Sequence, residues 1–451
     1  MKILALTCTL GLALAGAAHA DQSPAARVGA DAIVSHTLDN GLKVVIWPDH
    51  DIPNVALYTW FRVGGRNEYP GITGLAHFFE HMMFNGTRTL APGEFDRTME
   101  AAGGANNAYT SSDVTVYQDW FPKQALDTIL DLEADRMANL AFDPKVIESE
   151  RGVVYSERRS SVDNQPFGAL AEQMQATAFV AHPYQFPVIG WPSDVEAWTH
   201  DDLKTFFTTY YAPNNAVMFV VGDVEPTAVM EKIRARFAAI PRQPAPRAIT
   251  TVEPEQQGER RVVVEKPDLQ APMLAMAWHI GNAKADDQAP LQLLQTILTE
   301  GDASRLHQRL VEQDQLALGV SGSVDAGFDP GLFWIYVMLP PGADPAVVEK
   351  VVDEELARLM ADGISEQELA KARKVAEAGF WNGLSTISSK AQALGSHEVF
   401  HGDYQALFEA PDKLAKVTRD NVNAAARTRL RATNRTVGVI RPASQTTRTG
   451  N

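Results

Sequence analysis

Two histidines and a glutamate lie within five residues of the sequence, in the order His77, Glu80, His81. On a helix, residues four positions apart project from the same face, so both imidazoles could bind one metal ion. Glu80 follows His77 by three positions and lies beside that face. A carboxylate next to two metal-binding histidines can act as a base towards water. The segment therefore predicts a metal centre and a catalytic base on one short helix.

The order H-x-x-E-H inverts the commoner zinc-hydrolase pattern H-E-x-x-H, in which the glutamate is a base and not a ligand. The pattern alone also fits an amphipathic helix with half-exposed histidines. A catalytic zinc ion needs a third protein ligand. The densest acidic helix downstream carries Glu150 and Glu157, seven positions apart and so on one face. One of them could bind the metal while the other supports it. A solvated acidic face is the alternative.

Short strands and helices alternate around these residues, which predicts an α+β fold. Asn40-Gly41, between two β-prone runs, indicates a hairpin turn. Asn85-Gly86 ends the histidine helix. Strands are predicted at 36–47, 55–63 and 105–120, and helices at 75–84, 92–102, 122–139 and from 144 onward.

The second half of the chain repeats this order of elements, which indicates duplication of a unit of about 200 residues. We expect two homologous domains at 21–242 and 261–442, each a mostly antiparallel sheet packed with helices. A stretch rich in Pro, Gln and Arg at 243–260 is predicted to link them. The second copy lacks the histidines, since its matching helix reads Leu293-Leu294-Gln295-Thr296-Ile297-Leu298. Only the first domain is therefore expected to bind metal.

The first 20 residues have the features of a signal peptide: Lys2, an apolar run, and Ala18-His19-Ala20 before Asp21. We expect export to the periplasm without stable membrane insertion, because no later stretch reaches about 18 uninterrupted apolar residues. The only cysteine, Cys8, lies in this segment, which excludes disulfides and thiolate zinc sites from the mature chain. The polar tail at 443–451 is expected to be flexible.

Composition narrows the classes of function further. The net charge of −16 argues against binding to nucleic acid or to anionic membrane surfaces. Hydrophobic residues make up 45% of the chain, enough for a large core in two or more domains. The 11 histidines are scattered and form no tract, which argues against a zinc carrier. An enzyme or an assembly subunit remains.

Five motifs occur in order along the chain: Gly64-Gly65-Arg66-Asn67-Glu68, Gly74 to Met82, Gly86-Thr87, Asn107-Ala108-Tyr109-Thr110 and Glu150 to Glu157. Together they resemble the pitrilysin/insulinase family of metallopeptidases, which includes the mitochondrial processing peptidase β subunit. The resemblance covers nearly the whole mature chain. It implies a zinc endopeptidase acting on peptides or unfolded segments, with one Zn²⁺ per chain.

The resemblance also implies a role for each residue of the site. It implies His77, His81 and Glu157 as metal ligands, Glu80 as general base and Glu150 as a supporting carboxylate. It further implies that Asn107 and Ala108 contact substrate, although Asn107 could be an ordinary turn residue.

The sequence departs from the family at two positions of the second domain. Members with a complete site carry an arginine and a tyrosine there, and this sequence aligns Val311 and Leu318 with them. Neither side chain can donate a hydrogen bond. We therefore expect a zinc-bearing subunit whose homologous partner lacks H-x-x-E-H and supplies the arginine and tyrosine. A homodimeric peptidase and a non-catalytic structural subunit are the alternatives.

Overall fold

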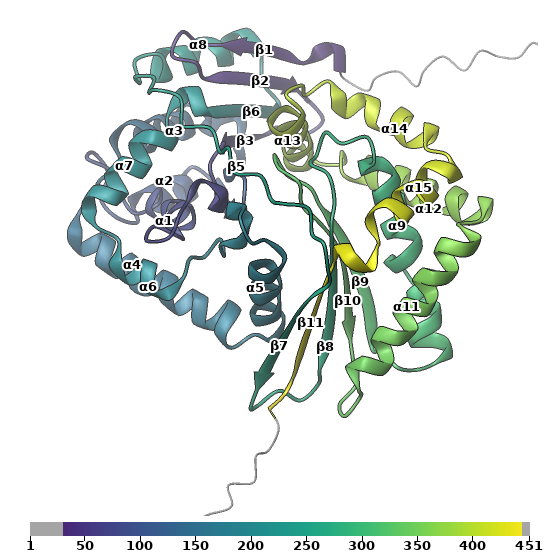
Figure 1. The fold of residues 1–451 in the computed structure, drawn as a ribbon. Helices are drawn as coiled ribbons and strands as arrows, with labels where there is room; N and C mark the ends of the chain where they lie inside the picture. Colours follow the sequence, from purple (N-terminus) through teal and green to yellow (C-terminus); the bar gives the residue numbers. More distant parts are fainter. Residues whose placement is uncertain (1–29, 444–451) are drawn as a thin grey trace, which may run out of the picture.

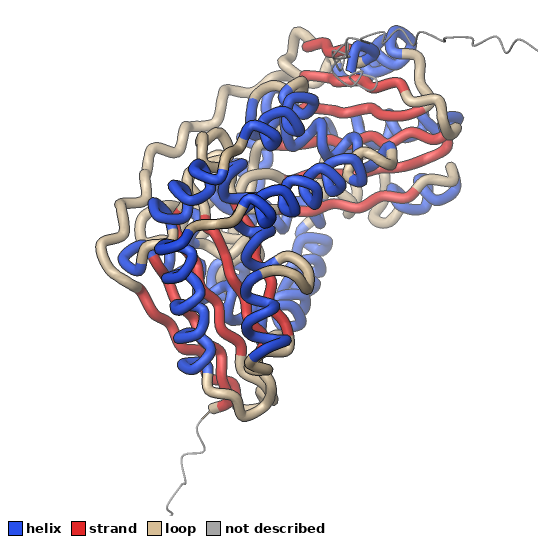
Figure 2. The backbone as a smooth tube through the Cα atoms, turned by 90° about the vertical axis from the view of Figure 1, so that its right-hand side faces the viewer, coloured by secondary structure: helices blue, strands red, loops and turns tan. Residues whose placement is uncertain are grey.

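The structure is a computed structural model that describes residues 30–443. The predicted signal peptide at 1–20 and the predicted tail beyond Ala443 lie outside the described residues. Within the described range, no helix combines the length and the apolar character needed to cross a bilayer. Figure 1 shows two lobes, each built around one sheet, and Figure 2 shows the two sets of strands with helices packed on them.

The first sheet has six strands: β1 Val34–Thr37, β2 Lys43–Pro48, β3 Asn54–Phe61, β4 Ala105–Thr110, β5 Thr115–Pro122 and β6 Ala216–Gly222. Their order is β1-β2-β6-β3-β5-β4. All neighbours are antiparallel except β2 and β6. The predicted turn joins β1 to β2, and Gly41 has a φ of 93°, a conformation that favours glycine.

The second sheet has five strands: β7 Arg260–Lys266, β8 Met273–His279, β9 Gly319–Asp325, β10 Leu332–Met338 and β11 Arg435–Pro442. Their order is β7-β11-β8-β10-β9, with β7 and β11 parallel and the other neighbours antiparallel. This order matches β2-β6-β3-β5-β4 strand for strand, with the parallel pair in the same place. The structure thus confirms the α+β fold with two duplicated, mostly antiparallel sheets.

The helices that precede the second sheet in the chain are α1 Leu75–Met82, α2 Glu94–Ala101, α3 Leu126–Asn139, α4 Pro144–Arg158, α5 Pro166–Ala178, α6 Pro192–Ala197, α7 His200–Tyr210 and α8 Pro226–Phe237. Asp143 caps α4 by accepting a hydrogen bond from the backbone N–H of Lys145, and Pro144 is its first residue, as the sequence predicts. Side chains of α1, α3 and α8 pack with Leu57 and Met218 in the main core of this half. The core thus supports the helix that carries the histidines.

The helices of the second half are α9 Gln288–Thr299, α10 Arg305–His307, α11 Pro345–Asp362, α12 Glu366–Asn382, α13 Ile387–Ser396, α14 Ala406–Lys416 and α15 Arg419–Arg429. α10 continues directly as a π-helix over Gln308–Gln313. The counterpart of α1 is α9, whose Leu293, Leu294 and Leu298 are fully buried. Buried leucines thus stand in the second half where α1 carries its histidines.

Two helices link the halves, and neither is predicted from the sequence. α5 belongs to the first half of the chain but packs on β7, β8 and β11, where Leu170 and Met174 contact the second sheet. α13 belongs to the second half but packs on β3 and β6, where Leu394 lies in a core with Trp60. Each sheet is therefore covered on one face by a helix from the other half (Figure 1).

Candidate metal centre

The helix α1 carries His77, Glu80 and His81 and lies against the first sheet. Its apolar residues, including Phe78 and Phe79, are fully buried. Two tyrosines below it bind its backbone: Tyr117 Oη donates to the carbonyl of Phe79 at 2.9 Å, and Tyr211 Oη donates to that of Ala76 at 3.2 Å. Burial and these two hydrogen bonds fix the height and rotation of the helix on the sheet.

The start of α1 is fixed by a buried glutamate and a close crossing of two loops. Both oxygens of Glu68 accept backbone hydrogen bonds at 2.7 Å, one from Gly74 and one from Ala76. Burial raises the pKa of Glu68 well above its usual value, against the lowering effect of these bonds. Gly74 has a φ of 90°, and a Cβ there would lie 2.8 Å from Cα of Gly190. No other residue fits this crossing without moving the helix.

The side chain of Glu157 on α4 meets the two histidines of α1. Its Oε2 lies 3.3 Å from Nε2 of His81 and 3.6 Å from Nε2 of His77. The possible ligand atoms of these three residues all lie within 4.8 Å of one another. In a tetrahedral zinc site, bonds of about 2.0–2.2 Å place ligand atoms roughly 3.3–3.6 Å apart. Two imidazoles and a carboxylate in this arrangement fit a zinc ion.

Hydrogen bonds within this trio shift the pKa values of two of its members. Hydrogen bonds from His77 and His81 hold the pKa of Glu157 well below its usual value, so it is ionised at neutral pH. Burial alone would lower the pKa of His81, but hydrogen bonds to Glu150 and Glu157 outweigh burial and raise the pKa to about 9. A histidine binds a metal ion through an unprotonated nitrogen, so a metal ion and a proton would compete for Nε2 of His81.

Glu150 lies outside the trio and supports His81 from behind. Its Oε1 is 2.7 Å from Nδ1 of His81, and its Oε2 accepts a hydrogen bond from Asn85 Nδ2 at 2.8 Å. A carboxylate on the second nitrogen of a metal-binding histidine fixes the ring and raises its basicity. Nδ1 of His77 is buried and has no such partner among the described residues. Glu150 thus holds the ring of His81 from its Nδ1 side. Glu157, on the same helix, faces Nε2 of both histidines.

Replacing Glu150 by glutamine is expected to raise the dissociation constant for zinc by about 10–100-fold, because His81 loses its charged partner. Competition with a chromogenic chelator measures this change. Glu148→Gln on the same helix is the matched control, since the Glu148 side chain is 80% exposed. Equal zinc affinities for the two variants would show that Glu150 gives no support.

Glu80 also lies outside the trio, on the same helix. Its Oε2 accepts a hydrogen bond from Thr110 Oγ1, at 2.6 Å, from the end of β4. Glu80 is partly exposed, so it can exchange a proton with a bound molecule. The carboxylate is thus held by a neutral donor next to the two histidines, a position that suits a base.

Asn107 and Ala108 lie on β4, the edge strand of the first sheet beside α1. Ala108 packs against the core on the side of α1. Asn107 is exposed, and strand alternation places it on the other face with Tyr109, whose ring packs against Trp60. The structure therefore does not bring the Asn107 side chain into the trio. Contact of these two residues with substrate stays a prediction.

Sequence reasoning missed several residues that position the site. The contacts of Thr110 with Glu80 and of Asn85 with Glu150 are not predicted from the sequence. The same holds for the hydrogen bonds that Glu68 accepts at the start of α1. A polar side chain just beyond the end of the histidine helix is the local signal for Asn85, whereas Glu68 lies outside the capping positions of that helix, whose N-cap is Gly74. No local pattern pointed to Thr110, because its partner lies 30 residues away.

Comparison with known proteins supports the same reading. The chain matches the description "Insulinase (Peptidase family M16)" over residues 43–190 and "Peptidase M16 inactive domain" over residues 197–375. The zinc protease PqqE of Helicobacter pylori is 34% identical over 377 residues, which are 83% of this chain and 84% of that protein. The chain belongs to the M16 peptidase family. The resemblance to pitrilysin and insulinase is thus confirmed.

Other M16 proteins extend the match. The uncharacterized zinc protease Rv2782c of Mycobacterium tuberculosis is 30% identical over 407 residues, 90% of this chain and 92% of that protein. A crystal structure of a protease from H. pylori has a TM-score of 0.88 and 31% identity, covering 91% of this chain and 99% of that chain. Both of the relatives named here are called zinc proteases.

The periplasmic protease PqqL from Escherichia coli shares the fold with a TM-score of 0.76 at 20% identity. The match covers 91% of this chain but 47% of PqqL, so this chain spans about half of that protein's length. The M16 "inactive domain" match begins before the second sheet, and that half holds α9 in place of the histidine helix.

Proposed function

We propose that this chain is a zinc endopeptidase that hydrolyses peptides or unfolded segments. The observation that carries the proposal is the meeting of His77, His81 and Glu157 within 4.8 Å, with Glu80 on the same helix as the histidines. Membership of the M16 family, whose relatives are named zinc proteases, supports the same chemistry.

Each residue of the site has a distinct task in peptide hydrolysis. When bound, zinc supplies a Lewis acid that polarises a peptide carbonyl and makes water more acidic. Glu80 accepts a proton from the attacking water and passes it to the leaving amine nitrogen. The hydrogen bond from Thr110 Oγ1 to Oε2 orients the Glu80 carboxylate for this transfer. Glu150 keeps the ring of His81 oriented throughout.

The substrate is proposed to bind along β4. This strand lies at the edge of the first sheet, and no strand among residues 30–443 pairs with its outer side. An extended peptide can add to such an edge through backbone hydrogen bonds. Its scissile bond would then pass Thr110 and Glu80, which lie at the end of this strand. Backbone recognition of this kind favours flexible chains over folded proteins.

We propose that the chain acts in the periplasm. The support is the signal-peptide pattern of residues 1–20, with Ala18-His19-Ala20 before Asp21. A structural neighbour described as a periplasmic protease, PqqL, has the same fold. Detection of the processed chain, beginning at Asp21, in a periplasmic extract would support this location.

A homologous partner is proposed to complete the site. Leu318 is 62% exposed and Val311 is partly buried, and neither can donate a hydrogen bond. The neighbouring Arg309 cannot replace the missing arginine, because its Nε lies 2.7 Å from Asp314 within the same lobe. A partner with arginine and tyrosine at the two positions would supply these donors.

The partner requirement predicts that the purified single chain cleaves a fluorogenic peptide about 10²–10³-fold more slowly than the complex purified from the native host, because oxyanion donors are missing. Chelation of zinc should abolish the activity of the complex. Equal rates for the single chain and the complex would contradict the requirement, and a dimeric single chain with full activity would indicate a homodimeric peptidase. A complex without chelator-sensitive activity would indicate a structural subunit.

A further inference from the structure

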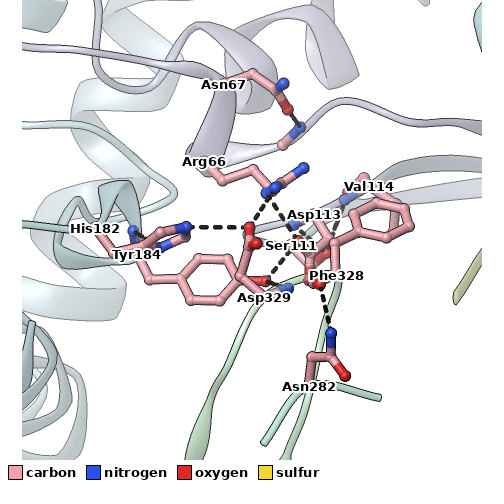
Figure 3. A network of polar contacts seen from close by, with 11 residues as sticks. Arg66, Asn67, Ser111, Asp113, Val114, His182, Tyr184, Asn282, Phe328 and Asp329 are labelled. Carbon is pink, nitrogen blue, oxygen red and sulfur yellow. Dashed lines mark hydrogen bonds and ion pairs between the residues drawn. The ribbon is translucent and has the colours of Figure 1, made fainter. Parts of the chain in front are cut away.

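The turn between β9 and β10 in the second half contacts Arg66, in the loop that precedes α1, and Asp113 of the first half. Gly327 in this turn packs so closely on Asp113 that a Cβ would overlap the carboxylate. Two residues later, the carboxylate of Asp329 meets Arg66 and His182 of the first half (Figure 3). Asp329, from the half without the histidine helix, thus contacts the half that contains this helix.

The hydrogen bonds define the protonation of this network. The backbone N–H of Tyr184 donates to Nδ1 of His182 at 3.2 Å, so the ring proton is on Nε2. Nε2 then donates to Oδ2 of Asp329 at 3.0 Å. Burial raises the pKa of Asp329, but the bond from His182 and the charge of Arg66 outweigh it and lower the pKa. Asp329 is therefore a carboxylate at neutral pH, with His182 and Arg66 as its two donors.

Arg66 connects Asp329 to the loop that precedes α1. It lies in a short 3-10 helix, η2 Gly65–Asn67. Its guanidinium binds Asp329 and lies 3.4 Å from Oδ1 of Asp113, while Phe328 packs at 5.3 Å from it. The backbone N–H of Arg66 donates to the carbonyl of Ser112 at 2.8 Å. Arg66 is thus held at both ends, by backbone on one side and by Asp329 on the other.

The same loop holds the start of the histidine helix. Glu68 follows Arg66 by two residues and accepts hydrogen bonds from the N–H groups of Gly74 and Ala76. His77 is the next residue of the chain. A continuous series of polar contacts and two short stretches of backbone therefore leads from Asp329 through Arg66 and Glu68 to His77.

We infer that Asp329 is a positioning residue, which holds α1 in the register that places His77 and His81 opposite Glu157. The significance for catalysis rests on the proposed function, but the positioning itself does not. The inference gives the second half a role in the site that needs no metal ligand of its own. A neutral residue at 329 would leave Arg66 with only the longer contact to Asp113, and η2 and α1 would open more often.

A second ion pair between the halves provides a matched control. Lys390 Nζ on α13 lies 2.5 Å from Oδ2 of Asp49, and both side chains are largely buried. Asp49 lies directly after β2, near the start of β3. η2 comes after the other end of β3. Loss of this pair weakens the contact between the halves without touching the loop before α1.

The experiment compares Asp329→Asn with Asp49→Asn in the purified full chain. Hydrogen exchange of the α1 amides is measured in the metal-free protein, and zinc affinity by chelator competition. We expect Asp329→Asn to speed exchange in α1 by about 10-fold and to raise the zinc dissociation constant by about 10-fold. Asp49→Asn should change neither quantity, even where both variants lower the melting temperature equally.

Unchanged exchange and zinc affinity in Asp329→Asn would overturn the inference and leave Asp329 as a contact between the halves only. If Asp329→Asn does not fold, Arg66→Lys gives the same comparison, since lysine keeps the charge but cannot bind both carboxylates. Exchange in the metal-free chain needs neither zinc nor activity. A failure of the proposed function, seen as absence of zinc binding in the unmodified chain, is thus distinguishable from a failure of the positioning role.

Discussion

Replacing Glu80 by glutamine is expected to lower peptide turnover by about 10²–10⁴-fold, the usual contribution of a general base. Glutamine has nearly the same shape and can still bond to Thr110, but it cannot accept a proton from water. Glu80 is not among the three clustered ligands, so one zinc per chain should remain bound. Turnover is measured by peptide cleavage in the complex from the native host, and zinc content by elemental analysis.

Glu148→Gln is again the control, because the same substitution is made at an exposed position of α4. It should keep both turnover and zinc. A Glu80→Gln variant with undiminished turnover would remove Glu80 from the role of base. Loss of zinc together with turnover would instead place Glu80 among the ligands, against the geometry of α1.

Replacing His81 by alanine is expected to abolish both zinc binding and peptide cleavage. The change removes one of three ligands and leaves Glu150 and Glu157 without the imidazole between them. The zinc dissociation constant should rise by more than about 100-fold, beyond the range expected of an outer residue. A ligand at 100 times its dissociation constant stabilises a protein by about 2.7 kcal/mol, so zinc should raise the melting temperature of the native chain and not that of the variant.

His36→Ala is the matched control for this substitution, since His36 is exposed on β1. Its zinc content and zinc-dependent rise in melting temperature should equal those of the native chain. If His81→Ala still showed the zinc-dependent rise, the stabilising metal would be bound elsewhere. The comparison does not depend on the partner subunit, because it uses the single chain.

The local part of the site could be predicted from the sequence. The spacing of His77 and His81 is a property of one helix, and Gly74 and Asn85-Gly86 mark its ends. The third ligand is different, because α1 and α4 meet across about 70 residues of chain. Helical spacing puts Glu150 and Glu157 on one face but does not decide which carboxylate reaches Nε2 of His81. Only the resemblance to M16 peptidases pointed to Glu157.

The repeated strands and helices could be predicted from the sequence. The two helices that pack on the sheet of the other half could not. Alternating strands and helices showed the duplication, and the matching strand orders of the two sheets agree with it. The packing of α5 on the second sheet and of α13 on the first depends on contacts between distant segments. Their sequences contain alanines and polar residues with no indication of the sheet they cover. The contacts of Asp329 and Thr110 could not be predicted for the same reason, because their partners lie far away in the chain.

The most direct test of the account is anomalous diffraction at the zinc edge from crystals of the zinc-loaded chain. We predict one peak per chain in the first domain, with Nε2 of His77, Nε2 of His81 and a carboxylate oxygen of Glu157 each at about 2.0–2.2 Å from it. A chain with no peak among these atoms, or with the three side chains turned away from one another, would contradict the assignment of this site as a zinc centre.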